Sequence, residues 1–211
     1  MCHAITSLQA AFDRADVFVN INNDQKELIL QRLRSENCGS FQLHVETERA
    51  GVGCAIRAFS ESLHKPVDLV IVLGDIIFDR AFPGWLRREI SRSEGSGGNS
   101  LVVVQRPRSA TKLDYDAVCV AEDGDIVAAV PRQDLTNTQP DSFKLYQVGG
   151  VIWLCQAARK VLGSLPRNSS FLDVIRILLI NQIRTRAACY EGLIDDFGTS
   201  DRLRALKARY K

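Results

Sequence analysis

Apolar and polar residues alternate along the first third of the chain in patterns that predict helices and strands in turn. Helices are expected over 3–15, 24–35 and 54–63, and strands over 17–21, 41–45 and 67–73. This alternation favours right-handed crossovers and a mainly parallel sheet with helices on both faces. We therefore predict an α/β fold, a Rossmann-like three-layer sandwich around a twisted sheet. The run 67–73 is expected to be central because both of its faces are apolar.

The pattern changes after residue 90. The stretch SRSEGSGGNS has no apolar anchor and predicts a loop, whereas Asp123-Gly124 between two alternating apolar runs predicts a β-hairpin. Ser170 and Asp173 form a capping-box pattern at the start of a helix. The remaining elements are a strand over 101–106, a polar loop over 131–144, a strand over 145–155 and a terminal helix over 200–210.

Composition limits the classes of function. A chain of 211 residues that is 45% hydrophobic is long enough for one domain, so residues 1–211 are expected to form a single unit. A net charge of +2 with both signs interspersed argues against binding to a nucleic-acid polymer. No apolar run approaches the ~20 residues that cross a membrane, and no leader pattern is present. The six cysteines lack a C-x-x-C pair, so we expect reduced thiols and a cytoplasmic protein.

Acidic residues stand at two places where a ligand would bind such a sheet. Asp75 follows Gly74 at the end of the run 67–73, and ligands of parallel sheets bind beyond the carboxyl ends of strands. A simple Gly-Asp turn is the alternative. Asp195 and Asp196 follow a later apolar run, where two adjacent carboxylates are costly unless a cation or hydrogen-bond donors meet them. Together these residues indicate a site.

A dinucleotide-binding site is a rival interpretation. Gly51-x-Gly53 opens a predicted helix, and Asp75 ends the next strand. However, Ile56 stands at the third glycine position of that fingerprint, and five residues, ETERA, separate the preceding strand from Gly51. These departures argue against a nicotinamide or flavin cofactor.

Five short motifs occur in order along nearly the whole chain. They span Glu48 to Ile56, Leu73 to Asp75, Tyr115 to Ile126, Val148 to Ile152, and Asp196 to Ser200. They resemble, in turn, the E-x-x-G-T-x-G-A-I, N-G-D, Y-G-x-V with D-G-x-I, N-x-G-x-Y and D-I-G-T-P motifs of the sugar-1-phosphate nucleotidyltransferases. That family makes nucleotide-diphosphate sugars, so the resemblance implies a transferase of nucleotide-sugar biosynthesis with the nucleotide-diphospho-sugar transferase fold.

The resemblance also implies a mechanism. A sugar-phosphate oxygen would attack the α-phosphorus of a nucleoside triphosphate in line, and pyrophosphate would leave. Asp75 and Asp196 would hold Mg²⁺ between them, with Asp195 pointing elsewhere or supporting them, and Asp75 and Arg132 would be catalytic. The substrates would contact Glu48, Gly51, Gly53, Gly74, Tyr115, Gly149 and Gly150.

The sequence departs from the family pattern in ways that bear on activity. No G-G-x-G-T-R-L loop, which holds the triphosphate in the family, is found, so we expect a domain that is N-terminally incomplete relative to the family. Val52 replaces the motif threonine, Val148 the asparagine, and Arg132 stands where the family has lysine. We therefore expect impaired nucleotidyl transfer by this chain alone.

Two other functions fit the same residues. A non-catalytic nucleotide-sugar binding or regulatory subunit would keep the fold without the triphosphate loop. A metal-dependent glycosyltransferase of related fold would use a nucleotide sugar as donor instead of making it. In each case the partners are nucleotides, sugar phosphates or nucleotide sugars, and apolar surface left by a missing first strand would favour a homo-oligomer.

Overall fold

The computed structural model describes residues 2–13, 16–36, 38, 40–46, 51–107, 116–137 and 143–196. Within these residues no helix has the length and apolar character needed to cross a membrane. The predicted terminal helix over 200–210 lies outside the described residues.

A six-stranded sheet forms the centre of the molecule. Its order is β7-β6-β8-β5-β9, and β3 pairs with the second half of the long strand β8. The strands are β3 (Leu69–Val72), β5 (Ser100–Gln105), β6 (Ala117–Val120), β7 (Ile126–Val130), β8 (Lys144–Leu154) and β9 (Thr185–Cys189). Strands β3, β5 and β9 run in one direction, and β8 runs against β3 and β5.

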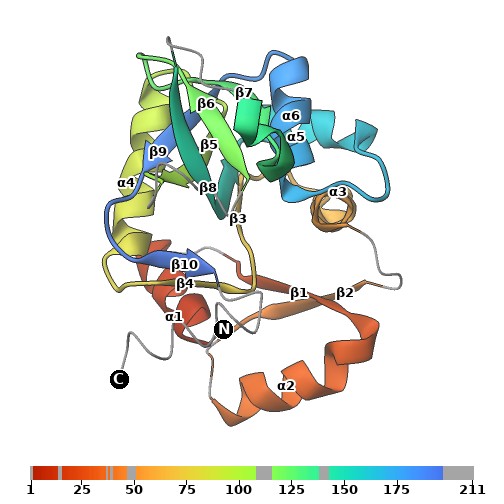
Figure 1. Cartoon of the computed structure of the whole chain (residues 1–211). Helices are drawn as coiled ribbons and strands as arrows, with labels where there is room; N and C mark the ends of the chain where they lie inside the picture. Colours follow the sequence, from red (N-terminus) through yellow and green to blue (C-terminus); the bar gives the residue numbers. More distant parts are fainter. Residues whose placement is uncertain are drawn as a thin grey trace.

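Helices cover both faces of this sheet, which confirms the predicted three-layer α/β fold. Helix α4 (Phe82–Gly95) lies on one face, and α3 (Val52–Ser62), α5 (Gln156–Lys160) and α6 (Phe171–Ile180) lie on the other (Figure 1). The short 3₁₀ helix η3 (Val161–Ser164) joins the second group.

Alternating side chains of the central strands divide the core into two layers. Val102 and Ile152, each 0% exposed, pack in the layer under α6. Leu101 and Trp153, each 2% exposed, pack in the layer that also holds residues of α4. The strands are apolar on both faces because each face meets a helical layer.

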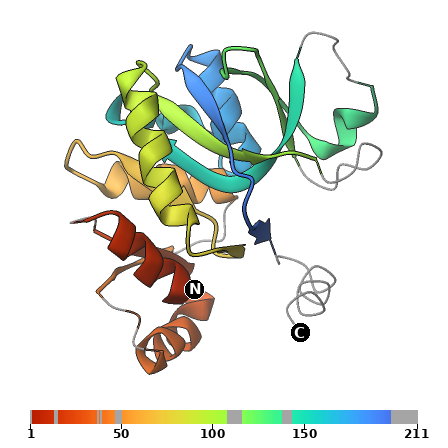
Figure 2. The ribbon, with the colours of Figure 1, turned by 90° about the vertical axis from the view of Figure 1, so that its left-hand side faces the viewer.

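The strands near the N-terminus form a sheet of their own, which corrects one prediction. Strands β1 (Phe18–Asn22) and β2 (Gln42–Glu46) pair in parallel but not with β3. Together with α1 (Cys2–Ala11), η1 (Asn23–Gln25) and α2 (Lys26–Ser35), they lie at one end of the molecule (Figures 1 and 2). Their separate core contains Ile5, Val19, Ile21 and Leu33.

Strand β3 is not the central strand that its apolar run predicts. Among the described residues it pairs with β8 alone, and only Leu69 of its four residues is buried. Strand β5, which β8 and β9 flank, is instead buried on both faces. An apolar run therefore identified a strand but not its place in the sheet.

The stretch 91–100, predicted as a loop, contains the last turns of α4. The helix continues to Gly95, and β5 begins at Ser100. Leu86, Ile90 and Ser93 form its buried face, and Ser93 is 2% exposed. The loop prediction was wrong because Ser93 occupies a buried position on the apolar face of α4. A serine there adds no apolar residue to the sequence pattern that predicts a helix.

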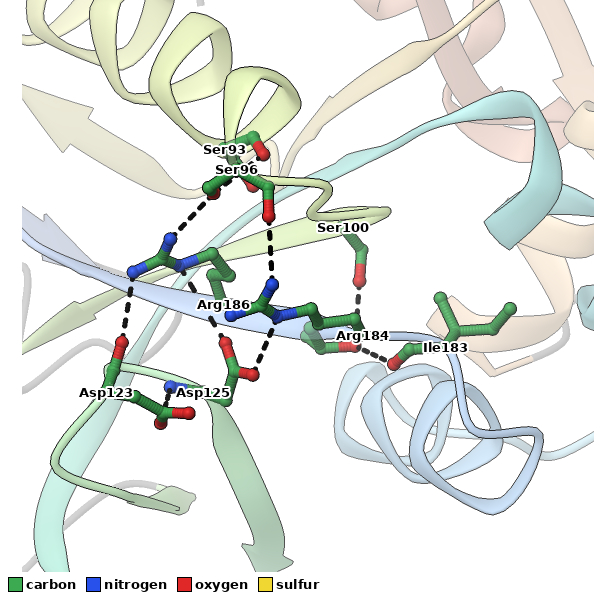
Figure 3. Close-up of polar contacts among 9 residues, drawn as sticks. Ser93, Ser96, Ser100, Asp123, Asp125, Ile183, Arg184 and Arg186 are labelled. Carbon is green, nitrogen blue, oxygen red and sulfur yellow. Dashed lines mark hydrogen bonds and ion pairs between the residues drawn. The ribbon is translucent and has the colours of Figure 1, made fainter.

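The predicted hairpin at Asp123-Gly124 is confirmed, and two arginines bind its turn through hydrogen bonds. Gly124 has φ +89°, as its turn requires, and β6 and β7 pair antiparallel. Arg184 donates from Nε to Asp125 at 2.8 Å and from Nη1 to the carbonyl of Ser96 at 2.9 Å. Arg186 donates to Ser96 Oγ and to the Asp123 carbonyl (Figure 3). The hairpin, β9 and the end of α4 therefore form one unit.

The cysteines differ in oxidation state. Cys54, Cys119, Cys155 and Cys189 are free thiols. Cys38 is disulfide-bonded, so the expectation of reduced thiols is wrong at that position. Burial raises the pKa of the Cys119 thiol and the Cys189 thiol, which makes them poor nucleophiles.

Candidate functional site

A cavity of about 150 Å³ opens where the loop after β3 meets the middle of β8. Asp75 and Asp195 line it at one end, and Gly149 and Gly150 of β8 form part of its wall. Phe171 also lines it, at the start of α6. That helix begins with the predicted capping box: Asp173 N–H donates to Ser170 Oγ, and Ser170 N–H donates to Asp173.

Two short strands bring the candidate metal-binding residues together. Strands β4 (Ile76–Phe78) and β10 (Ile194–Asp196) pair antiparallel, with Asp196 opposite Ile76. The backbone of Asp196 therefore lies beside the residue that follows Asp75. The predicted meeting of their carboxylates stays a prediction, because the side chain of Asp196 lies outside what the structure describes.

The two glycines of β8 are required by close packing around the cavity. Gly150 has φ +70°, and a Cβ there would meet Ile76 Cδ1 at 2.8 Å. Its carbonyl accepts the N–H of Leu73 at 3.1 Å. A Cβ on Gly149 would meet the Val103 carbonyl at 3.0 Å. Gly150 therefore lets the loop that carries Asp75 lie directly against β8, and Gly149 lets β8 lie close to β5.

Asp79, which the sequence analysis did not single out, ties β10 to β4. Its carboxylate accepts hydrogen bonds from the Tyr190 hydroxyl at 2.5 Å and from Leu193 N–H at 2.8 Å. It also accepts from Ala81 N–H and Phe82 N–H at the start of α4. Because Leu193 directly precedes β10, Asp79 fixes the strand that carries Asp195 and Asp196.

The Asp79–Tyr190 contact shifts both pKa values. Burial alone would raise the pKa of Asp79, but the Tyr190 hydroxyl and the N–H groups of Leu193, Ala81 and Phe82 outweigh it, and the pKa is lowered. Burial, together with the Asp79 charge, raises the pKa of Tyr190. The ionised carboxylate and the neutral phenol are therefore both favoured by folding.

This pair predicts how stability depends on pH. A lowered pKa stabilises the fold above the ordinary aspartate value of 3.8, and the effect is lost as pH falls below it. A raised tyrosine pKa stabilises the fold below the ordinary value of 10.0, and the effect is lost as pH rises above it. Tyr190→Phe should therefore flatten the alkaline loss of unfolding free energy, measured in urea between pH 3 and 11. Tyr146→Phe is the matched control, and an unchanged alkaline loss in Tyr190→Phe would contradict the assignment.

The other end of the cavity is polar and was not predicted. Gln105 and Gln147 lie opposite each other in the β5–β8 pairing, and both line the cavity together with Asp116. Asp116 Oδ1 accepts the backbone N–H of Arg132 at 3.2 Å. The sequence held one signal: Gln147 interrupts an otherwise apolar strand, at a position that is 8% exposed.

Arg132 lies at the margin of the cavity and does not line it. It begins the 3₁₀ helix η2 (Arg132–Asn137), directly after the hairpin strand β7, and its side chain is exposed. The contact of its N–H with Asp116 joins this segment to the cavity wall. Its predicted catalytic role stays a prediction.

Gly51, Gly53 and Gly74, which are also predicted to contact the substrates, do not line the cavity. Gly51 N–H and Gly53 N–H donate to the carbonyls of Arg167 and Ser169, at 3.3 and 2.8 Å. A Cβ on Gly53 would meet Ser169 Cβ at 2.7 Å, so this glycine permits close packing of α3. Gly74 is exposed with open space around it. Glu48 and Tyr115 lie outside the described residues.

The residues at the aspartate end fit a magnesium ion. Mg²⁺ in proteins takes one or two carboxylates and completes its shell with water and substrate phosphates. Asp75 and Asp195 supply carboxylates in the cavity wall. Within the described part of the chain no group of three or more His, Cys, Asp or Glu side chains could hold a metal ion.

No protein-family model and no curated protein sequence matches the chain. Solved structures do match it. A putative glucose-1-phosphate thymidylyltransferase from Bacillus anthracis, in complex with sucrose, has a TM-score of 0.74 at 18% identity, over 98% of this chain and 80% of that one. A UDP-glucose pyrophosphorylase complexed with UDP-glucose has a TM-score of 0.73 at 16% identity, over 99% and 85%. The inositol-1-phosphate CTP transferase from T. maritima has a TM-score of 0.73 at 12% identity, over 98% and 79%.

At these identities the similarity shows a common architecture, and the aligned region covers 98–99% of this chain. The cavity lies where β3 ends against Gly149 and Gly150 of β8. The chain therefore has the fold of the sugar-1-phosphate nucleotidyltransferases.

Proposed function

We propose that the chain is a nucleotidyltransferase-like domain that binds a nucleoside triphosphate and a sugar 1-phosphate, or the nucleotide sugar they form. The observation that carries this proposal is the cavity in which Asp75 and the Asp195-Asp196 strand meet beside Gly149 and Gly150. Similarity to solved thymidylyl-, uridylyl- and cytidylyltransferase structures supports it.

The proposed reaction is a phosphoryl-type transfer. A sugar-phosphate oxygen attacks the α-phosphorus, the bond from that phosphorus to the bridging oxygen of the β-phosphate breaks, and pyrophosphate leaves. Asp75 and Asp196 would hold Mg²⁺, which would supply charge neutralisation for the phosphates. Arg132 adds positive charge at the margin of the cavity, and Asp79 keeps β10 in place. Catalysis of this kind depends mainly on positioning and on charge.

A binding or regulatory subunit is the second candidate, because no stretch of these 211 residues matches a glycine-rich triphosphate loop. Losing one preorganised donor to developing charge costs about 3–4 kcal/mol, or roughly 10²–10³ in rate, and such a loop supplies several. We therefore expect this chain, assayed alone, to bind a nucleotide sugar weakly and to form little product.

The test combines binding with turnover. Calorimetry with the common nucleoside triphosphates, sugar 1-phosphates and nucleotide sugars, with and without Mg²⁺, should give weak, Mg²⁺-dependent binding. Pyrophosphate release with the same triphosphates and sugar phosphates should be slow. Turnover at ordinary enzyme rates would contradict the expected impairment, whereas binding of none of these compounds would refute the proposed function.

A further inference from the structure

The N-terminal part of the molecule is a small unit with a core of its own. Helix α1, the parallel pair β1–β2 and helix α2 form this unit, which we call the N-terminal lobe, at one end of the molecule (Figures 1 and 2). A two-stranded sheet with a small core is marginally stable by itself. A covalent cross-link therefore adds more to the order of this lobe than to that of the main domain, whose cores are larger.

Cys38 takes part in such a cross-link, because it is disulfide-bonded, belongs to the core of the lobe and is 3% exposed. The chain contains six cysteines. Four of them are free thiols and are therefore excluded as the partner of Cys38: Cys54, Cys119, Cys155 and Cys189. Cys2 is the cysteine that this leaves.

The spacing of residues along α1 supports this partner. Ile5 belongs to the same core as Cys38, and Gln9 Nε2 donates to the carbonyl of Ser40. Positions i, i+3 and i+7 share one face of a helix, and Cys2, Ile5 and Gln9 have this spacing. Position 2 therefore lies on the face of α1 that packs against the segment between α2 and β2.

We propose that Cys2 and Cys38 form a disulfide that fastens the N-terminal lobe, and that its reduction loosens the lobe. The bond joins the first turn of α1 to the segment before β2 and encloses β1 and α2 in a covalent loop. Two molecules of glutathione reduce it: the S–S bond breaks, each cysteine gains one hydrogen atom, and glutathione disulfide forms. Disulfides of reducing compartments are usually transient and redox-sensing. The order of the lobe therefore follows the redox state of its surroundings.

The buried position of Cys38 is compatible with this exchange, because a thiol reaches the bond whenever the lobe opens locally. Such an opening separates only two strands and a small core, so it costs less than unfolding the main domain. The described cysteines of the main domain are already free thiols. Reduction is therefore expected to change the lobe and to leave the central sheet unchanged.

The lobe directly precedes residues that are predicted to contact the substrates. Strand β2 ends at Glu46, and Glu48 and Gly51 follow it along the chain. A loosened lobe holds these residues less firmly, so reduction should weaken the binding of nucleotides. This consequence rests on the proposed function, whereas the disulfide and its effect on the lobe do not.

Hydrogen exchange of the full chain, followed by mass spectrometry, tests the proposal. The chain is equilibrated with glutathione disulfide or with glutathione before exchange begins. Amides of β1 and α2 should exchange roughly 100-fold faster in the reduced chain, because a cross-link across a loop of this size suppresses opening by about that factor. Amides of β5 should exchange at the same rate in both states. Peptide mapping of the oxidised chain should give one cross-linked peptide pair, which contains Cys2 and Cys38.

Three variants assign the effect to residues. Cys38→Ala should exchange like the reduced wild-type chain under both conditions, and Cys2→Ala should match it. Cys2→Ala also provides the second reading if Cys38→Ala does not fold. Cys155→Ala removes a half-buried free thiol of the main domain and is the matched control, so it should keep the full difference between the two conditions.

The outcomes separate this inference from the proposed function. A cross-link from Cys38 to another cysteine, or equal exchange of β1 and α2 in both states, would overturn the proposal. If the lobe exchanges faster on reduction but the affinity for nucleotides with Mg²⁺ is unchanged, the disulfide orders the lobe without acting on the site. If neither state binds nucleotides, the proposed function fails, and the exchange rates still decide the role of the disulfide.

Discussion

Asp75→Asn is expected to lower the affinity of the chain for Mn²⁺ by about 100-fold, the upper end of what loss of a metal-site group costs. The amide keeps the shape of the carboxylate but removes the charge, and hard divalent cations bind carboxylate oxygens preferentially. The measurement is free Mn²⁺ by electron paramagnetic resonance, in the presence of the nucleotide that the wild-type chain binds best.

A series of aspartate variants makes the prediction specific. Asp196→Asn should lower Mn²⁺ affinity as much as Asp75→Asn does. Asp195→Asn should lower it by roughly 10-fold, because we expect Asp195 to orient the ligating carboxylates and not to bind the ion itself. Asp13→Asn, on an exposed turn, is the control. If Asp75→Asn retains the affinity of Asp13→Asn, the cation does not bind at this end of the cavity. If Asp195→Asn has the largest effect, the ligand is Asp195 and not Asp196.

The elements that the sequence predicts well are those with a strong local signal. The capping box at Ser170 and the turn at Gly124 each depend on a few adjacent residues, and both are present. Asp75 could be identified because it follows an apolar strand, where parallel sheets bind ligands. Asp75, Gly149 and Gly150, which the family motifs single out, line one cavity, and their contact with substrates stays a prediction.

The features that the sequence does not predict depend on contacts between distant segments. Strands β4 and β10 have three residues each, which is too few for a periodic pattern. The hydrogen bond from Leu193 N–H, just before β10, to Asp79 could therefore not be predicted from the sequence. Gln105 and Gln147 become a pair only through the register of β5 with β8. Gly53 resembles a ligand-binding glycine, and its packing against Ser169 is evident only once α3 and α6 are placed.

The core beside the site is expected to be highly sensitive to truncation. Phe82 is 0% exposed, and its ring centroid lies 4.8 Å from Phe78, 5.7 Å from Trp85 and 5.1 Å from Tyr190. Phe82→Ala should lower the free energy of unfolding by about 3–5 kcal/mol, the usual cost of removing a buried phenyl group. The melting temperature should fall by about 10 °C for a chain of this size. Urea and thermal unfolding measure both.

The same substitution should also weaken the candidate metal site, because the aromatic cluster supports both strands that form it. Phe78 belongs to β4, and Tyr190 holds Asp79, which binds the backbone before β10. A cavity at Phe82 would free these strands to move, so Mn²⁺ affinity measured well below the melting temperature should fall as well. Phe143→Ala removes a phenyl group that is 41% exposed and should change stability by about 0.5 kcal/mol or less. If Phe82→Ala lowers the melting temperature but leaves Mn²⁺ affinity equal to that of Phe143→Ala, the aromatic cluster stabilises the fold without positioning the aspartates.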